Sequence, residues 1–103
     1  MTMQVKLDTG DGVARLVLNG RFDFNSHRDF RSISEEALKT EGVREIEVDL
    51  GGVDYLDSSA LGMLLLLREK ANLGNQRLAL LNCRGIVQQV LDVANFNKLF
   101  TIR

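Results

Sequence analysis

The sequence predicts an α/β domain built on a small mixed β-sheet, with its helices mainly on one face. Strand-like and helix-like apolar spacings alternate along the chain in the order β-β-α-β-α-β-α, which is typical of parallel crossovers. A Gly-Asp-Gly turn separates the first two strands and favours an antiparallel hairpin. Residues 45–50 place carboxylates at alternate positions, which indicates a sheet face that helices leave uncovered.

The first two strands are expected at residues 3–7 and 13–19, with the turn at residues 10–12 between them. In the second strand, alanine and leucine occupy every other position, so one of its faces is apolar. A loop over residues 20–25 then leads to the first helix, and a short terminal strand is expected at residues 99–102.

The first helix is expected to open at Ser26, because Ser26 followed by Asp29 resembles a capping box. Gly42 can end this helix. The preceding loop carries Phe22 and Phe24, which are either core or contact residues. Their spacing of two favours the core for both, since residues two apart share one side of an extended segment.

The second half of the chain holds the most apolar helix, which we expect to be central to the fold. Its leucine run, residues 64–67, is expected in the core. The carboxylates of Glu45, Glu47 and Asp49 are expected on a solvated strand face rather than in an active site. The predicted elements are a strand at 45–50, a connection at 51–57, a helix at 58–72 ended by Gly74-Asn75, a strand at 76–81, a loop at 82–85 and a helix at 86–94.

The composition indicates one globular domain, residues 1–103, with 45% hydrophobic and 26% charged residues. A formal net charge of −1 gives no electrostatic case for binding nucleic acid, which usually needs a basic face. The longest apolar run is far short of the roughly 20 residues that cross a bilayer, so we expect no membrane insertion. The single cysteine excludes an intrachain disulfide and suits a cytoplasmic location.

The sequence offers no constellation for catalysis, so we expect a protein that is not an enzyme and needs no cofactor. It has neither a Gly-x-Ser-x-Gly elbow nor a Gly-rich phosphate loop ending in lysine. His27 is the only histidine and is expected at the surface; Cys83 is expected to be a small buried hydrophobe. One cysteine and one histidine cannot build a four-ligand zinc site.

The most informative segment is Asp54–Gly62, where a connection feeds the start of the leucine-rich helix. The free N–H groups and the dipole of a helix N-terminus attract anions. Ser58 and Ser59 are therefore able to cap the helix or to carry a phosphate there. By residue type alone capping is favoured, because serine and aspartate are common N-caps.

The run Asp57-Ser58-Ser59-Ala60-Leu61-Gly62 resembles the phosphorylation motif of STAS domains, the family of anti-sigma factor antagonists. Gly20-Arg21-Phe22-Asp23 resembles the Gly-x-x-Asp loop of this family, and Ile46–Leu50 resembles its central strand. The resemblance covers nearly the whole chain and implies the STAS fold. The segments Arg21–Phe24 and Tyr55–Gly62 also resemble those of the single-domain STAS regulators of proteobacterial phosphorelays.

The resemblance implies that Ser58 is the phosphoacceptor, with Ser59 as the second choice. It also implies a partner-binding face, in which Asp23 and the loop at residues 22–25 are expected near Ser58 if the second strand runs parallel to the third. The residues of this face are Asp23, Phe24, Asn25, Asp57, Ser58, Ser59, Leu61 and Gly62. Two positions depart from the family pattern: Ala60 replaces a common glycine, and Arg21 stands where many relatives carry an acidic residue.

The function implied is that of an anti-sigma factor antagonist. The unphosphorylated form would sequester an anti-sigma factor and so regulate transcription. A serine kinase and a phosphatase, such as a response regulator with that output, would set its state. The alternative is a STAS accessory subunit of a membrane transporter of the ABC type. The serine-bearing motif favours the antagonist.

Overall fold

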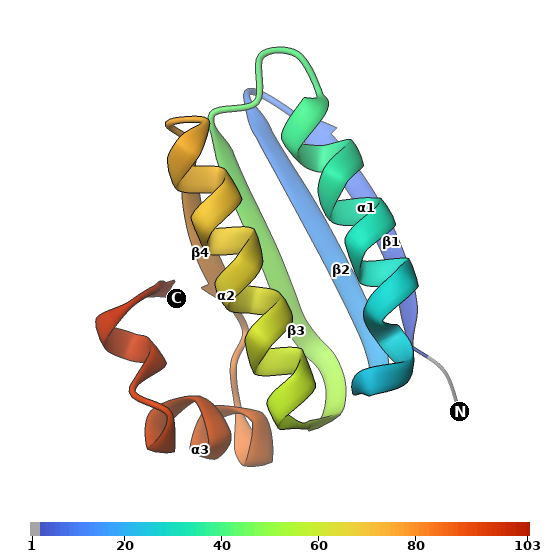
Figure 1. Cartoon of the computed structure of the whole chain (residues 1–103), viewed down its shortest axis with the longest axis vertical. Coiled ribbons are helices and arrows are strands. Elements are labelled where there is room, and N and C mark those ends of the chain that lie inside the picture. Colours follow the sequence, from blue (N-terminus) through green and yellow to red (C-terminus); the bar gives the residue numbers. More distant parts are fainter. Residues whose placement is uncertain (1–2) are drawn as a thin grey trace.

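The computed structural model describes residues 3–103, which form one five-stranded sheet with three α-helices (Figure 1). The strands lie in the order β1-β2-β3-β4-β5; β1 is antiparallel to β2, and the other neighbours are parallel. Their bounds are β1 (Gln4–Gly10), β2 (Val13–Phe22), β3 (Glu45–Leu56), β4 (Arg77–Leu81) and β5 (Thr101–Ile102). The predicted mixed sheet is confirmed.

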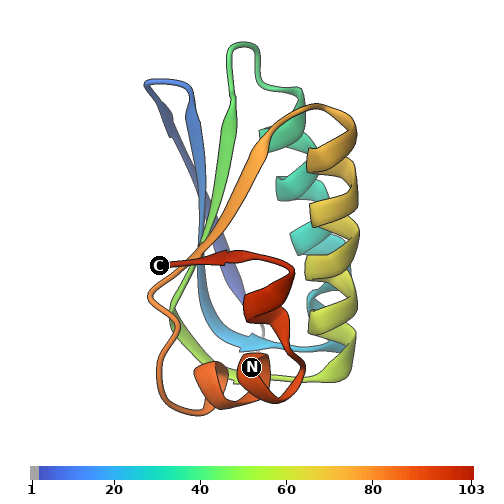
Figure 2. The same cartoon turned by 90° about the vertical axis from the view of Figure 1, so that its left-hand side faces the viewer.

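The two long helices cover one face of the sheet, as Figure 2 shows with the sheet seen nearly edge-on. The helices are α1 (His27–Lys39), α2 (Ser58–Leu73) and α3 (Gly85–Val93), with short 3-10 helices η1 (Phe24–Ser26) and η2 (Phe96–Lys98). α3 packs at the end of the sheet where α2 begins (Figure 1). The main core lies between the sheet and the pair α1 and α2, and the largest of its fully buried side chains are Phe22, Leu16, Leu18, Ile46, Leu50, Leu64, Leu67 and Leu80.

The β1–β2 hairpin turns at Asp11 and Gly12, whose φ angles are 55° and 79°. Two successive positive φ angles are the conformation of a type I′ turn, whose twist matches that of the flanking strands. Aspartate and glycine both tolerate it. The turn therefore falls at Asp11-Gly12, within the predicted residues 10–12, and β1 runs three residues past its predicted end, to Gly10.

β3 continues through the residues that were expected to form a connection. Gly51 and Gly52 lie inside the strand, and pairing with β2 resumes after an irregularity and runs to Leu56. A Cβ atom on Gly52 would lie 1.8 Å from the Asn19 side chain and 3.0 Å from the Leu18 carbonyl oxygen. The glycine therefore permits close approach between strands and does not mark a chain break. The predicted connection at residues 51–57 is wrong for all but Asp57.

The capping box lies one turn earlier than predicted. Asp23 caps η1, and Ser26 completes this box with its hydroxyl. Ser26 is buried and makes no side-chain cap for α1, so its predicted pairing with Asp29 is wrong. The turn also separates the two phenylalanines: Phe22 is fully buried, whereas Phe24 is 73% exposed. Phe24 is therefore not a core residue.

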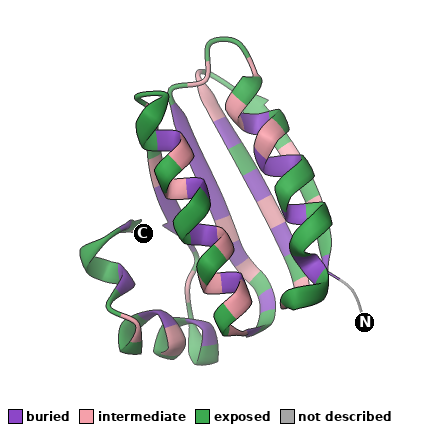
Figure 3. Cartoon of the chain, in the orientation of Figure 1, coloured by how far each residue is buried: buried purple, intermediate pink, exposed green. Residues whose placement is uncertain are grey.

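α2 has the predicted start but is less buried than predicted. Among its leucines, Leu64 and Leu67 are buried, while Leu65 and Leu66 are 38% and 47% exposed. Figure 3 shows the exposed and half-buried positions along the outer side of this helix. The expectation that the whole run 64–67 belongs to the core is wrong. Within residues 3–103 the longest and most apolar helices still fall short of what crossing a bilayer requires.

The sheet face opposite α1 and α2 holds an ion-pair network instead of solvated carboxylates. Glu45 and Glu47 are each only 7% exposed. Arg103 contacts both carboxylates at 2.9 and 3.0 Å, Arg77 contacts Glu45 at 3.1 Å, and Arg15 contacts Glu47 at 2.9 Å. Hydrogen bonds from Arg103 and Arg77 lower the pKa of Glu45 from 4.5 to about 2. These contacts bury both carboxylates by ion pairing, so the expectation of a solvated strand face is wrong for them.

Candidate functional site

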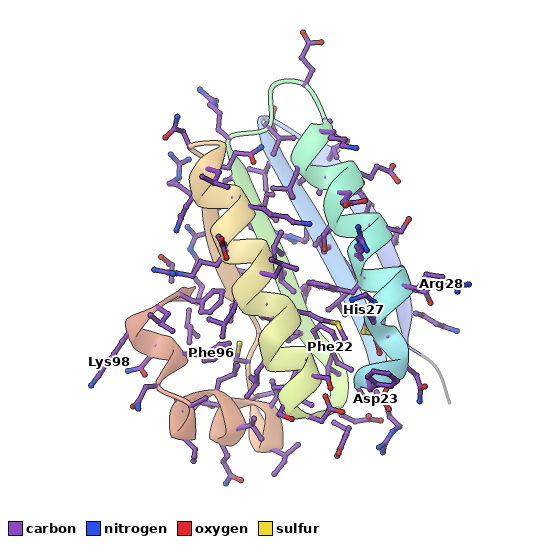
Figure 4. All side chains as sticks on the ribbon, viewed as in Figure 1. Phe22, Asp23, His27, Arg28, Phe96 and Lys98 are labelled. Carbon is purple, nitrogen blue, oxygen red and sulfur yellow. The ribbon has the colours of Figure 1, made fainter. Side chains whose placement is uncertain are left out.

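Parallel pairing of β2 and β3 brings the candidate site together. Phe22 pairs with Leu56, so the chain leaves both strands at the same edge of the sheet. The N–H of Asp57 donates to the carbonyl oxygen of Phe22 at 3.3 Å. Figure 4 shows Asp23 at the end of the molecule where α2 begins. The predicted proximity of the segment after β2 to the start of α2 is confirmed.

Asp57 is the N-cap of α2, with extended backbone. Its Oδ1 accepts a hydrogen bond from the N–H of Ala60 at 2.9 Å, which is the usual N-cap contact. Its Oδ2 accepts from the N–H of Phe24 at 3.2 Å. One carboxylate therefore holds both the helix start and the loop after β2.

Asp23 organises the loop from the other side. Its Oδ1 accepts from the N–H of Asn25 at 2.9 Å, while its own N–H donates to the Ser26 hydroxyl at 3.1 Å. The Ser26 hydroxyl in turn donates to the carbonyl oxygen of Arg21 at 3.0 Å. These contacts stabilise the loop, on which Phe24 and Asn25 are exposed.

Ser58 is the first residue of α2, and its side chain is exposed. Ser59 is half-buried, so the two serines differ in their access to solvent. At this end of a helix the first N–H groups have no acceptor in a preceding turn, and they favour a negative charge. Leu61 is half-buried and Gly62 is exposed on the same part of α2. The arrangement can accept a phosphate on Ser58 without burying it.

Two residues beside this segment were not singled out as contact residues from the sequence. Tyr55 is 38% exposed and pairs in register with Arg21, whose guanidinium carbon lies 3.9 Å from the centre of the tyrosine ring. Arg21 also contacts Asp23, with Nε 3.4 Å from Oδ2. Side chains alternate between the two faces of a strand, so Tyr55 is expected on the face opposite the buried Leu56. This expectation requires that β3 extend to Leu56, which the sequence analysis did not predict.

The single histidine and the single cysteine lie in separate parts of the fold, His27 on α1 and Cys83 in the segment between β4 and α3. His27 begins α1 and is exposed, as predicted. Cys83 is half-buried, and burial together with the nearby carboxylate of Asp49 raises the pKa of its thiol to about 11. The thiol is therefore protonated and unreactive at neutral pH.

Comparison with known proteins places this geometry in a family. Residues 5–101 match the family model described as "Mlab, STAS domain". A STAS-domain containing protein of Pseudomonas aeruginosa is 45% identical over 97 residues, which are 93% of this chain and 94% of that protein. The anti-sigma F factor antagonist of Paenibacillus polymyxa is 24% identical over 102 residues, or 99% of this chain and 87% of that protein.

The solved structures agree in fold. An anti-sigma factor antagonist from Mycobacterium paratuberculosis superposes with a TM-score of 0.85 at 18% identity, covering 97% of this chain and 84% of that one. The phosphorylated form of the Bacillus cell fate determinant SpoIIAA superposes with a TM-score of 0.74 at 18% identity, covering 97% and 91%. The fold is thus that of anti-sigma factor antagonists, and the family match spans almost the whole chain. The chain belongs to the STAS domain family.

Proposed function

We propose that this protein is an anti-sigma factor antagonist whose binding is controlled by phosphorylation of Ser58. The observation that carries the proposal is the position of Ser58. Its exposed side chain directly follows the N-cap Asp57, on the helix end that the Asp23 loop adjoins. Membership of the STAS family and the name of the Paenibacillus relative support this function.

The proposed switch needs no catalytic group in this chain. A partner serine kinase transfers the γ-phosphoryl group of ATP to the Ser58 hydroxyl, with release of ADP and the hydroxyl proton. A partner phosphatase, such as the output domain of a response regulator, hydrolyses the ester to serine and inorganic phosphate. The domain only has to present Ser58 and tolerate the phosphate, which carries a charge of about −1.5 to −2 at pH 7.

The unphosphorylated face would bind the anti-sigma factor in the cytoplasm and so release a sigma factor for transcription. Its contact residues would be those predicted from the sequence, Asp23, Phe24, Asn25, Asp57, Ser58, Ser59, Leu61 and Gly62, together with Tyr55. Phe24 supports this role, because a phenylalanine that is 73% exposed on a held loop is a ready anchor for a partner.

The test is phosphorylation of the purified protein by serine kinases of its own organism, followed by intact-mass measurement and peptide mapping. We expect one phosphate on Ser58 and none on the Ser58→Ala variant. A phosphate found only on Ser59 or elsewhere contradicts the assignment. Affinity capture with the unphosphorylated protein tests the partner: an anti-sigma factor supports the proposal, and a transporter ATPase would replace it with an accessory role in transport.

A further inference from the structure

A shallow apolar groove runs between α1 and α2, on the side of these helices that faces away from the sheet. Phe30 of α1 and Met63, Leu66 and Leu67 of α2 supply its apolar walls. Phe30 and Leu67 are buried in the core, whereas Leu66 is 47% exposed. The groove therefore presents apolar surface that is not covered by packing against the sheet.

The composition of α2 points to a partner for this surface. Residues 60–67 of the helix are all apolar or glycine, yet only Ala60, Leu64 and Leu67 among them are buried against the rest of the chain. A surface helix normally carries polar residues on the side that faces solvent. Single exposed leucines are common on protein surfaces, whereas adjoining apolar side chains such as Met63 and Leu66, three residues apart on α2 in one groove, are typical of a protein contact site.

The rim of the groove is basic. His27, Arg31 and Lys70 line it, and Arg28 lines the adjoining recess on α1. Glu35 is the acidic residue in contact with this rim, with its carboxylate 3.5 Å from Arg31 and 3.8 Å from Lys70. The patch is thus cationic on a chain whose formal net charge is −1.

We infer that this groove receives the apolar face of an acidic amphipathic helix from the partner protein. An apolar side chain of that helix packs against Met63 and Leu66 at the mouth of the groove, and its flanking carboxylates meet Arg31 and Lys70. This is the helix-in-groove mode of recognition. The inference rests on the proposed function for the identity of the partner, and it adds a second contact site beside the Ser58 face.

The groove is continuous with that face. η1 ends at Ser26, directly before His27 at the groove's end, and Phe24 of η1 is held by Asp57, which precedes Ser58. Figure 4 shows His27 and Asp23 at the same end of α1. A partner helix lying along α2 therefore reaches the phosphorylation site with one of its ends.

Charge and shape favour this occupant over the other candidates. A second copy of the chain would oppose one basic rim with another, which is repulsive. A membrane surface is flat, whereas the apolar groove is recessed between two helices.

The probe is a synthetic helix of about 18 residues with leucines on one face and glutamates beside them. Titration into the ¹⁵N-labelled full chain, followed by NMR, should shift the amide signals of His27, Arg31, Leu66 and Lys70. The same peptide with lysine in place of glutamate should bind roughly tenfold more weakly or not at all. Shifts confined to other surfaces, or no shifts, overturn the inference. Sedimentation of the protein with phosphatidylglycerol vesicles but no response to the peptide would assign the groove to lipid instead.

Two matched pairs of variants locate the contact. Leu66→Glu should weaken peptide binding by roughly tenfold or more, whereas Leu65→Glu, on the neighbouring exposed position outside the groove, should change it by less than about twofold. Lys70→Glu should weaken binding while Lys39→Glu, with the same change of net charge, should not. Thermal unfolding verifies that each variant folds. Equal effects within either pair overturn the inference.

The outcome is separable from that of the Ser58 proposal. If the peptide binds but Ser58 is never phosphorylated, the groove stands and the switch fails. If Ser58 is phosphorylated and the peptide does not bind, the switch stands and the groove inference fails.

Discussion

The carboxylate of Asp57 accepts a hydrogen bond from the backbone N–H of Phe24, 33 residues earlier in the chain, at 3.2 Å. Its second oxygen caps α2 through the N–H of Ala60 at 2.9 Å. One side chain thus joins the loop after β2 to the helix that carries Ser58. The shape of the candidate partner face depends on this connection.

Replacing Asp57 should therefore loosen both elements at once. Asp57→Ala removes the N-cap and the contact with Phe24, so we expect the free energy of unfolding to fall by about 1–2 kcal/mol in urea titrations. Asp57→Asn keeps one acceptor oxygen and should lose less. The control is Asp54→Ala at a nearby exposed position, with an expected loss below about 0.5 kcal/mol. Similar losses for Asp57→Ala and Asp54→Ala would contradict the joining role.

The ion pairs of Glu45 should make folding sensitive to acid. Arg103 and Arg77 lower its folded pKa from 4.5 to about 2, so the folded state favours the carboxylate. This contribution to stability is complete above about pH 4.5 and is lost as the pH falls from there toward 2. Glu45→Gln should destabilise the protein at pH 7 by roughly 1–2 kcal/mol and should flatten the decline of stability between pH 4.5 and 2.

Urea midpoints measured at a series of pH values check this expectation. Glu36→Gln serves as the control, because Glu36 is exposed on α1. If the curves of Glu45→Gln and the parent protein stay parallel through the acid range, Glu45 is not responsible for the acid sensitivity.

The element order and the sheet class were predictable because they follow from apolar periodicity along the chain. The start of α2 was predictable from Asp57 and Ser58, since its N-cap signal is local in sequence. The proximity of Asp23 to Asp57 was expected only if the second strand ran parallel to the third, and the parallel pairing of β2 with β3 meets that condition.

The errors lie where distant segments decide the structure. Gly51-Gly52 has the composition of a break, but pairing with β2 continues the strand past it, and Tyr55 was missed for this reason. Glu45 and Glu47 alternate like solvated residues, yet arginines from β2, β4 and the C-terminal segment bury them. No local pattern in the sequence contains these contacts.

Phosphorylation should switch partners without unfolding the domain. The N-terminus of α2 tolerates negative charge, so Ser58→Asp and Ser58→Ala should melt close to the parent protein. A partner surface that receives a neutral serine should reject the charge, because burying an unpaired charge costs several kcal/mol. A loss of about 3 kcal/mol weakens binding more than a hundredfold.

Calorimetric titration of the anti-sigma factor against the three forms measures this effect. Ser58→Ala should bind like the unphosphorylated protein, and Ser58→Asp should bind far more weakly. Equal affinities, or a Ser58→Asp protein that is unfolded, count against control by charge.

We expect Gly62 to be needed for binding the partner and not for the stability of the fold. It is exposed in α2, and no atom would lie within 4 Å of a Cβ added there. Since glycine within a helix costs roughly 0.5–1 kcal/mol relative to alanine, Gly62→Ala should stabilise the protein by about that amount. If the anti-sigma factor approaches this point closely, the added methyl group should weaken its binding by about tenfold, or about 1.4 kcal/mol.

Asn72→Ala is the matched control, because it also improves helix propensity on an exposed position of α2 but lies near the other end of the helix. Urea unfolding and calorimetric titration of both variants separate the two effects. A Gly62→Ala protein that is more stable and binds as tightly as the parent would remove Gly62 from the partner face.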